Sequence, residues 1–183
     1  MVACRVAALV EEFDIKLEMV WRRRNTQEIS LCDRLSKDFD LSEYRISRAS
    51  FEEIEEEYGP WQIDWFASDW SRRMDRFASR YWTIGTDIID AFSQDWSLYV
   101  GFFHPPLSEV ARVMEKIEID KAKGVVIVPD WPGSEVDSIM MQAKRVVELL
   151  DIKQMTFESP DWRDDDTFRG LSGFGIRIYR TIF

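Results

Sequence analysis

The stretch His104-Pro105-Pro106-Leu107 has the composition and the position of a ligand-binding turn. It follows an apolar run, Tyr99–Phe103, and precedes a helical pattern over residues 108–119. Because proline cannot donate a hydrogen bond to a β-ladder, the run predicts a strand that ends at His104. Ligands of open α/β sheets bind at the carboxyl ends of such strands, and a neutral imidazole can accept one hydrogen bond there. A single histidine at a strand end is, however, more often a structural residue than a catalyst.

Four arginines form the main basic cluster of an acidic chain: Arg72, Arg73, Arg76 and Arg80. If they share one helix face beside the His104 turn, they can bind phosphate; otherwise they are exposed surface residues. The net charge of −10 argues against a protein that coats nucleic acid, because phosphate binding needs a local positive field. Tryptophans offer another way to bind bases, although core packing is their commoner role: Trp61, Trp65, Trp82, Trp96 and Trp131.

No residue pattern predicts a bound metal ion or a membrane span. Cys4 and Cys32 have neither metal-ligand nor disulfide spacing, which favours a reducing compartment, the cytoplasm or the nucleus. The acidic run Asp164–Asp166 directs successive side chains differently and is typical of a loop. The apolar segment Val6–Val10 is too short to cross a bilayer. We therefore predict an intracellular protein that does not insert into membranes.

Strand patterns alternate with helical patterns from Gly59 to Phe183. The first predicted strand and its exit turn cover residues 61–68. Further strands are predicted over residues 99–104, 124–129, 152–157 and 174–183, with a short one within 87–96, and the last is expected to be antiparallel. The predicted helices cover 51–58, 108–119 and 134–150, the first of them opened by a capping box of Ser50 and Glu53. This alternation predicts an α/β fold, a Rossmann-like sheet with helices on both faces.

A smaller unit precedes this domain. Helical patterns over residues 2–13 and 26–37 flank a strand pattern over residues 16–21. A helix–strand–helix unit of this size cannot hold a core alone, so we interpret it as the end of a larger domain. We place the two domains at residues 1–49 and 50–183.

Residues 21–37 contain two linked motifs, Trp21-Arg22-Arg23-Arg24 and Cys32-Asp33-Arg34-Leu35-Ser36-Lys37. They resemble the end of the RNase H domain of retroelement polyproteins, where a Trp-x-x-Arg strand precedes a helix with an Ala-Asp-x-Leu-Ser-Arg signature. The resemblance implies that Asp33 matches the last catalytic carboxylate of that domain. Two-metal hydrolysis needs several convergent carboxylates, so we expect no RNase H activity from Asp33 alone.

A second set of motifs lies in order along residues 59–132: Gly59-Pro60, Asp64-x-Phe66-Ala67-Ser68, Phe77-x-Ser79-Arg80, Asp90-Ala91-Phe92, Asp95-Trp96, Pro105-Pro106 and Val128-Pro129-x-Trp131-Pro132. The ordered set is similar to the segment that follows RNase H in tyrosine-recombinase (DIRS-like) retrotransposons. Together the two resemblances cover nearly the whole chain. In those elements the second segment looks like a Dam-type DNA adenine methyltransferase, which uses S-adenosylmethionine.

The resemblance implies a cofactor site formed by Asp64, Ala67 and Ser68. It also implies that His104, Pro105 and Pro106 hold the target base. In the family an Asn/Asp-Pro-Pro-aromatic turn accepts hydrogen bonds from the adenine amine, and its ring stacks on the flipped base. This chain departs from that pattern at the turn, where His104 replaces Asn or Asp and Leu107 replaces the aromatic residue. It also departs in the cofactor loop, which lacks glycine and carries Ser71 where relatives have Asn. We therefore expect methyl transfer to be impaired.

The leading hypothesis is a fragment of a retrotransposon reverse-transcriptase polyprotein that ends in an impaired, Dam-like methyltransferase domain. Its partners would be DNA or RNA and the rest of that polyprotein. One alternative is a non-enzymatic nucleic-acid-binding module or remnant. Another is an active methyltransferase of altered substrate, in which His104 does the work of the family's asparagine.

Overall fold

The computed structural model describes residue 16, residues 45–158 and residues 174–183. Contacts divide the chain into two compact units, residues 1–40 and residues 41–183. All described residues except Lys16 belong to the second unit. The elements predicted within residues 2–37, the RNase H-like residue Asp33 and the acidic run Asp164–Asp166 lie outside the described residues.

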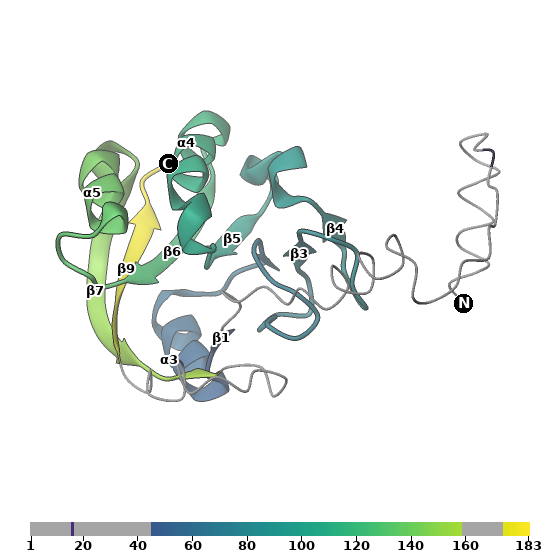
Figure 1. The fold of residues 1–183 in the computed structure, drawn as a ribbon, viewed down its shortest axis with the longest axis horizontal. Helices are drawn as coiled ribbons and strands as arrows, with labels where there is room; N and C mark the ends of the chain where they lie inside the picture. Colours follow the sequence, from purple (N-terminus) through teal and green to yellow (C-terminus); the bar gives the residue numbers. More distant parts are fainter. Residues whose placement is uncertain (1–15, 17–44, 159–173) are drawn as a thin grey trace, which may run out of the picture. The chain divides into compact units, whose positions relative to one another are not determined.

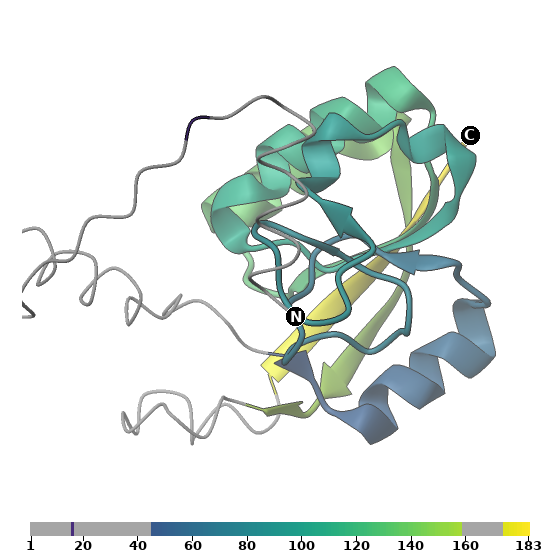
Figure 2. The same cartoon turned by 90° about the vertical axis from the view of Figure 1, so that its right-hand side faces the viewer.

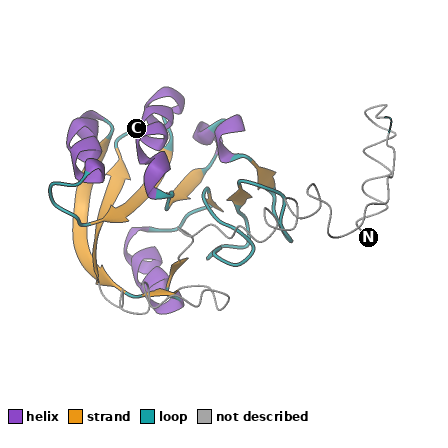
Figure 3. Cartoon of the chain, viewed as in Figure 1, coloured by secondary structure: helices purple, strands orange, loops and turns teal. Residues whose placement is uncertain are grey.

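A mixed five-stranded sheet forms the centre of the second unit (Figures 1 and 3). Its strands lie in the order β2 (Ile63–Asp64), β5 (Val100–Phe103), β6 (Lys123–Pro129), β9 (Phe174–Thr181) and β7 (Val147–Met155). β2, β5 and β6 are parallel, whereas β9 runs antiparallel to both of its neighbours. The α/β class, the two central strands and the antiparallel last strand are thus as the sequence predicts.

Two short strands form a separate two-stranded sheet that lies next to β2. β3 (Ala78–Ser79) and β4 (Ile88–Ile89) pair in parallel, and a parallel bridge joins Phe77, just before β3, to Asp64 of β2. Because β5 already occupies one side of β2, this bridge places β3 on the other side. After β2 the chain therefore continues to β3 on one side of β2 and then crosses to β5 on its other side. The strand order reverses between β2 and β5.

Helices cover both faces of the sheet (Figure 2). α4 (Val110–Asp120) and α5 (Glu135–Gln142) pack on one face, and α3 (Arg48–Tyr58) packs on the other. Successive side chains of a strand point to opposite faces. On β6, Val126 and Val128 accordingly join the α4 and α5 core, while Val125 and Ile127 join the α3 core.

The helix predicted over residues 134–150 is wrong in its second half. Ser134 caps α5, but the helix ends at Gln142 and a short 3₁₀ turn, Ala143–Arg145, follows. Residues from Val147 onward form the long strand β7, which pairs with β9 along its whole length. Strand pairing and burial of Val147 here override the helical pattern, which continues across the boundary.

The start of α3 also differs from the prediction. Its N-cap is Ser47, whose hydroxyl accepts the Ser50 N–H at 3.2 Å, so the helix begins at Arg48. Ser50 is instead buried inside the helix, where its hydroxyl accepts the N–H of Thr156. Just before α3, β1 (Arg45–Ile46) pairs antiparallel with β8 (Phe157–Glu158), and we call this pair the β1–β8 ribbon.

Trp65 and Trp96 are both fully buried, but their indole N–H groups differ in hydrogen bonding. Trp96 Nε1 donates to the Ala91 carbonyl at 2.7 Å, whereas Trp65 Nε1 has no partner among the described residues. Leaving a buried polar group unpaired costs about 1–3 kcal/mol, and a made hydrogen bond contributes about 1 kcal/mol. In urea unfolding we expect Trp96→Phe to lose at least about 1 kcal/mol more stability than Trp65→Phe. Equal losses would contradict this assignment.

Candidate functional site

The reversal point of the sheet brings two predicted site residues to adjacent strand ends. Asp64 is the last residue of β2, opposite Phe102 of β5, and His104 follows β5 directly. Since side chains alternate along a strand, Asp64, Phe102 and His104 belong to the same face, the one covered by α3. In doubly wound sheets ligands bind outside the carboxyl ends of the strands at such a reversal.

Asp64 is a deeply buried carboxyl group, with an exposed fraction of 3%. Its Oδ1 accepts the backbone N–H of Phe66 at 3.3 Å. Burial raises the pKa of Asp64 to about 7, and hydrogen bonds from the backbone N–H groups of Phe66 and Arg73, with the positive charge of Arg73, offset this only in part. The carboxyl group can therefore change its protonation state near neutral pH, as acid–base groups of functional sites do.

His104 is half-buried between two aromatic residues. Its ring centroid lies 6.4 Å from that of Phe102 and 6.2 Å from that of Phe157 in β8. Burial lowers the pKa of His104 to about 4, so the imidazole is neutral at pH 7. It therefore does not repel an amine on which positive charge develops, and it keeps the chemistry of a hydrogen-bond acceptor.

The rest of the turn leads straight into a helix. Pro105 is buried, and the carbonyl of Pro106 accepts the Glu109 N–H at 2.9 Å, which starts the 3₁₀ turn Leu107–Glu109. Leu107 packs against the α4 and α5 core. At this position Leu107 has no aromatic ring on which a base could stack, and its side chain packs toward the core.

The predicted cofactor residues Ala67 and Ser68 follow Asp64 in a loop that satisfies its own hydrogen bonds. Ser68 N–H donates to Ser71 Oγ at 2.8 Å, and Ser68 Oγ accepts the N–H groups of Trp70 and Ser71. Ala67 N–H donates to the carbonyl of Ala78 in β3. The backbone N–H groups of Ala67, Ser68, Trp70 and Ser71 are thus already hydrogen-bonded within the protein, and the loop contains no helix.

The four predicted nucleic-acid-binding arginines do not share a helix face, because residues 65–76 contain no helix. Arg76 donates to the hydroxyl of Tyr99 at 3.0 Å, and Tyr99 precedes β5, so this guanidinium lies toward the strand end opposite His104. Arg72 and Arg80 are exposed, with Cζ 5.3 Å from the Phe77 ring and 5.5 Å from the Tyr81 ring. Only Arg73 lies against Asp64, and its side chain is 9% exposed.

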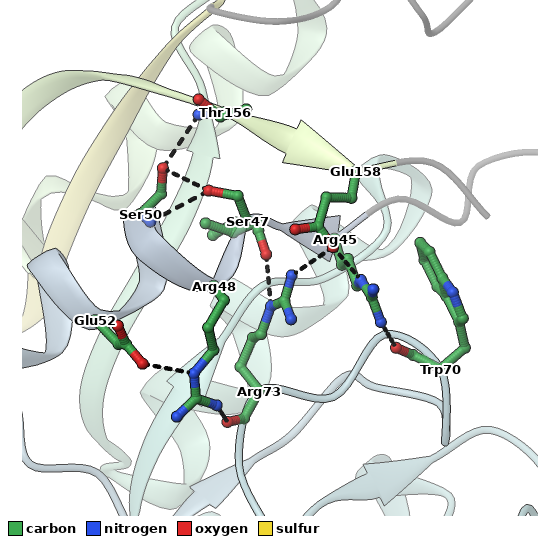
Figure 4. A network of polar contacts seen from close by, with 10 residues as sticks. Arg45, Ser47, Arg48, Ser50, Glu52, Trp70, Arg73, Thr156 and Glu158 are labelled. Atoms are coloured by element: carbon green, nitrogen blue, oxygen red, sulfur yellow. Dashed lines mark hydrogen bonds and ion pairs between the residues drawn. The ribbon is translucent and has the colours of Figure 1, made fainter. Parts of the chain in front are cut away.

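Arg73 belongs to a polar network that sequence reasoning missed (Figure 4). Its guanidinium contacts the Ile46 carbonyl at 2.6 Å and Glu158 at 3.0 Å, and Arg45 contacts the same Glu158 at 2.7 Å. These contacts hold the β1–β8 ribbon beside Asp64 and His104. No local motif could have revealed them, since Arg45 and Glu158 are 113 positions apart.

The five tryptophans considered for base binding divide into two groups. Trp61, Trp65 and Trp96 are buried in the two cores, whereas Trp82 and Trp131 are 48% and 40% exposed. Within residues 45–158 and 174–183, no group of three His, Cys, Asp or Glu side chains could hold a metal ion. In the same residues no helix is long and apolar enough to cross a membrane.

Comparison with known proteins finds no family model, no curated protein and no solved structure that matches the chain.

Proposed function

We propose that residues 50–183 are a Dam-like, Rossmann-type methyltransferase domain of a retrotransposon polyprotein in which methyl transfer is impaired. The observation that carries the proposal is that β2 is bridged to the chain before β3 on one side and paired with β5 on the other, with Asp64 ending β2 and His104-Pro105-Pro106 following β5. The parallel strands β2, β5 and β6, with helices on both faces of the sheet, also support a Rossmann-type domain. Fold alone does not imply activity, so the site has to decide it.

Two features of the target-base turn support impairment. A methyltransferase of this type holds the adenine amine on two acceptors and stacks the base on an aromatic ring. His104 supplies one acceptor in neutral form, but Leu107 is packed into the core and offers no ring. Stacking on an aromatic side chain contributes about 1–3 kcal/mol per base, so its loss weakens capture of the flipped base by about tenfold or more.

The test combines cofactor binding with methyl transfer. In calorimetry we expect weak binding of S-adenosylmethionine, because the loop after β2 offers few free hydrogen-bond donors. We expect this binding to be lost in Asp64→Asn. We expect no methyl transfer to single- or double-stranded DNA from the natural chain. Transfer should appear in a His104→Asn/Leu107→Phe variant, which restores the acceptor and the ring. Continued inactivity of that variant, with cofactor bound, would refute our account of the turn.

A second candidate function is a nucleic-acid-binding module without cofactor. The hydrogen bonds within the Ser68–Ser71 turn favour this second function, because N–H groups that would bind a cofactor already donate to the hydroxyls of Ser68 and Ser71. The same calorimetry separates the two candidates. Absence of any S-adenosylmethionine binding, together with binding of DNA, would replace the methyltransferase proposal by this one.

A further inference from the structure

The guanidinium groups of Arg45 and Arg73 converge on one carboxylate oxygen of Glu158 (Figure 4). Arg45 Nε and Arg73 Nη2 lie 2.7 Å and 3.0 Å from the same atom, Oε2 of Glu158. Arg45 is fixed further by the Trp70 carbonyl and by the Trp70 ring, 4.2 Å from its Cζ. Arg73 is fixed by the Ile46 carbonyl. Both cations are therefore held in place by the backbone, with one anion between them.

The charges of this cluster do not balance. Burial alone would raise the pKa of Glu158, but hydrogen bonds from Arg45 and Arg73 lower it below its ordinary value, so Glu158 supplies one full negative charge. Asp64, beside Arg73, is partly protonated near neutral pH because burial raises its pKa to about 7. The neighbouring Arg48 is already paired with Glu52. Among the described residues of this cluster, positive charge exceeds negative charge, although the whole chain carries a net charge of −10.

Under the proposed function, a nucleic-acid strand bound at the His104 turn passes beside Arg45 and Arg73. Phe157, which precedes Glu158 in β8, contacts the ring of His104 in the turn assigned to the target base. A base held at that turn brings its backbone phosphates to the surrounding loops. Guanidinium groups bind phosphate in a bidentate manner, with two acceptor oxygens for two donors. A carboxylate shared by two arginines presents the same kind of acceptor.

We propose that Arg45 and Arg73 form a binding site for a backbone phosphate of nucleic acid, and that Glu158 occupies this site when no ligand is bound. The choice of nucleic acid as the ligand rests on the proposed function. Phosphate replaces the Glu158 carboxylate on the two guanidinium groups. Because Glu158 belongs to β8, this exchange also loosens the β1–β8 ribbon next to His104.

The test measures binding of a short, fluorescently labelled single-stranded DNA by anisotropy at low salt. Glu158→Gln removes the competing charge and keeps the side-chain shape, so we expect about tenfold tighter binding. Adding Arg45→Gln to that variant should abolish the gain. Circular dichroism confirms that each variant is folded. Unchanged affinity in Glu158→Gln would overturn the proposal.

Glu148→Gln is the matched control. Glu148 pairs with Arg180 between β7 and β9, on exposed side chains, and its substitution changes the net charge by the same amount. We expect this variant to bind DNA like the natural chain. If it tightened binding as much as Glu158→Gln does, general electrostatics would explain the gain and the phosphate site would be refuted.

A second readout needs neither DNA nor methyl donor, so its failure is distinct from failure of the proposed function. His104 is the only histidine of the chain, and diethyl pyrocarbonate modifies neutral imidazole. Loosening of the ribbon in Glu158→Gln should raise the modification rate of His104 severalfold over that of the natural chain and of Glu148→Gln. An unchanged rate would refute the coupling between Glu158 and the ribbon.

Discussion

Gly124→Ala should cause the largest loss of stability of any single substitution considered for this chain. Gly124 faces Gly101 in the β5–β6 pair, and a Cβ atom built on it would lie 1.9 Å from the Gly101 carbonyl oxygen. Its φ of +150° is also one that residues with side chains rarely adopt. The clash is with backbone in a central strand, so it is relieved only by separating β5 from β6. We expect a loss of at least about 4 kcal/mol in the free energy of unfolding, measured with urea.

Gly133→Ala is the control for this prediction. Gly133 also has positive φ, +80°, but no atom lies within 4 Å of the position its Cβ would take. Only the backbone conformation then opposes the change, which costs about 1–2 kcal/mol. Losses of similar size at the two glycines would mean that β5 and β6 can separate more easily than their register indicates.

The central strands were predictable because their local signals agree with their tertiary surroundings. The run Gly124–Pro129 is continuously apolar and β-branched, and β6 is indeed buried between two cores. The boundary near Val147 was not predictable in this way. Helical periodicity continues across it, and only pairing with β9, whose residues lie about thirty positions later, makes residues 147–155 a strand.

The candidate site shows the same contrast between features set by local sequence and features set by long-range contacts. The position of His104 at the end of its strand was predicted, because a proline pair follows it. That Asp64 ends the neighbouring strand β2 is seen only in the structure. The arginines were not predictable from their spacing. Arg73 is fixed by Glu158, 85 positions away, and Arg76 by Tyr99, 23 positions away, so residues close in sequence face different parts of the sheet.

The two titratable groups at the reversal point act on stability in opposite directions. His104 has its pKa lowered to about 4, so the stability that its neutral form provides is present above its unfolded pKa of about 6.5 and is lost as pH falls. Asp64 has its pKa raised to about 7, so the stability that its protonated form provides is present below its unfolded pKa of about 3.9 and is lost as pH rises.

Asp64→Asn should therefore become more stable relative to the natural chain as pH rises. Asparagine keeps the size of the side chain and cannot ionise, so it escapes the cost of burying a charge. Between pH 5 and pH 8 the difference in unfolding free energy should shift by about 3 kcal/mol in favour of the variant. Urea unfolding at several pH values measures it, and His104 cancels because both proteins carry it. A difference that stays constant over this range would show that Asp64 ionises in the folded chain as freely as it does in water.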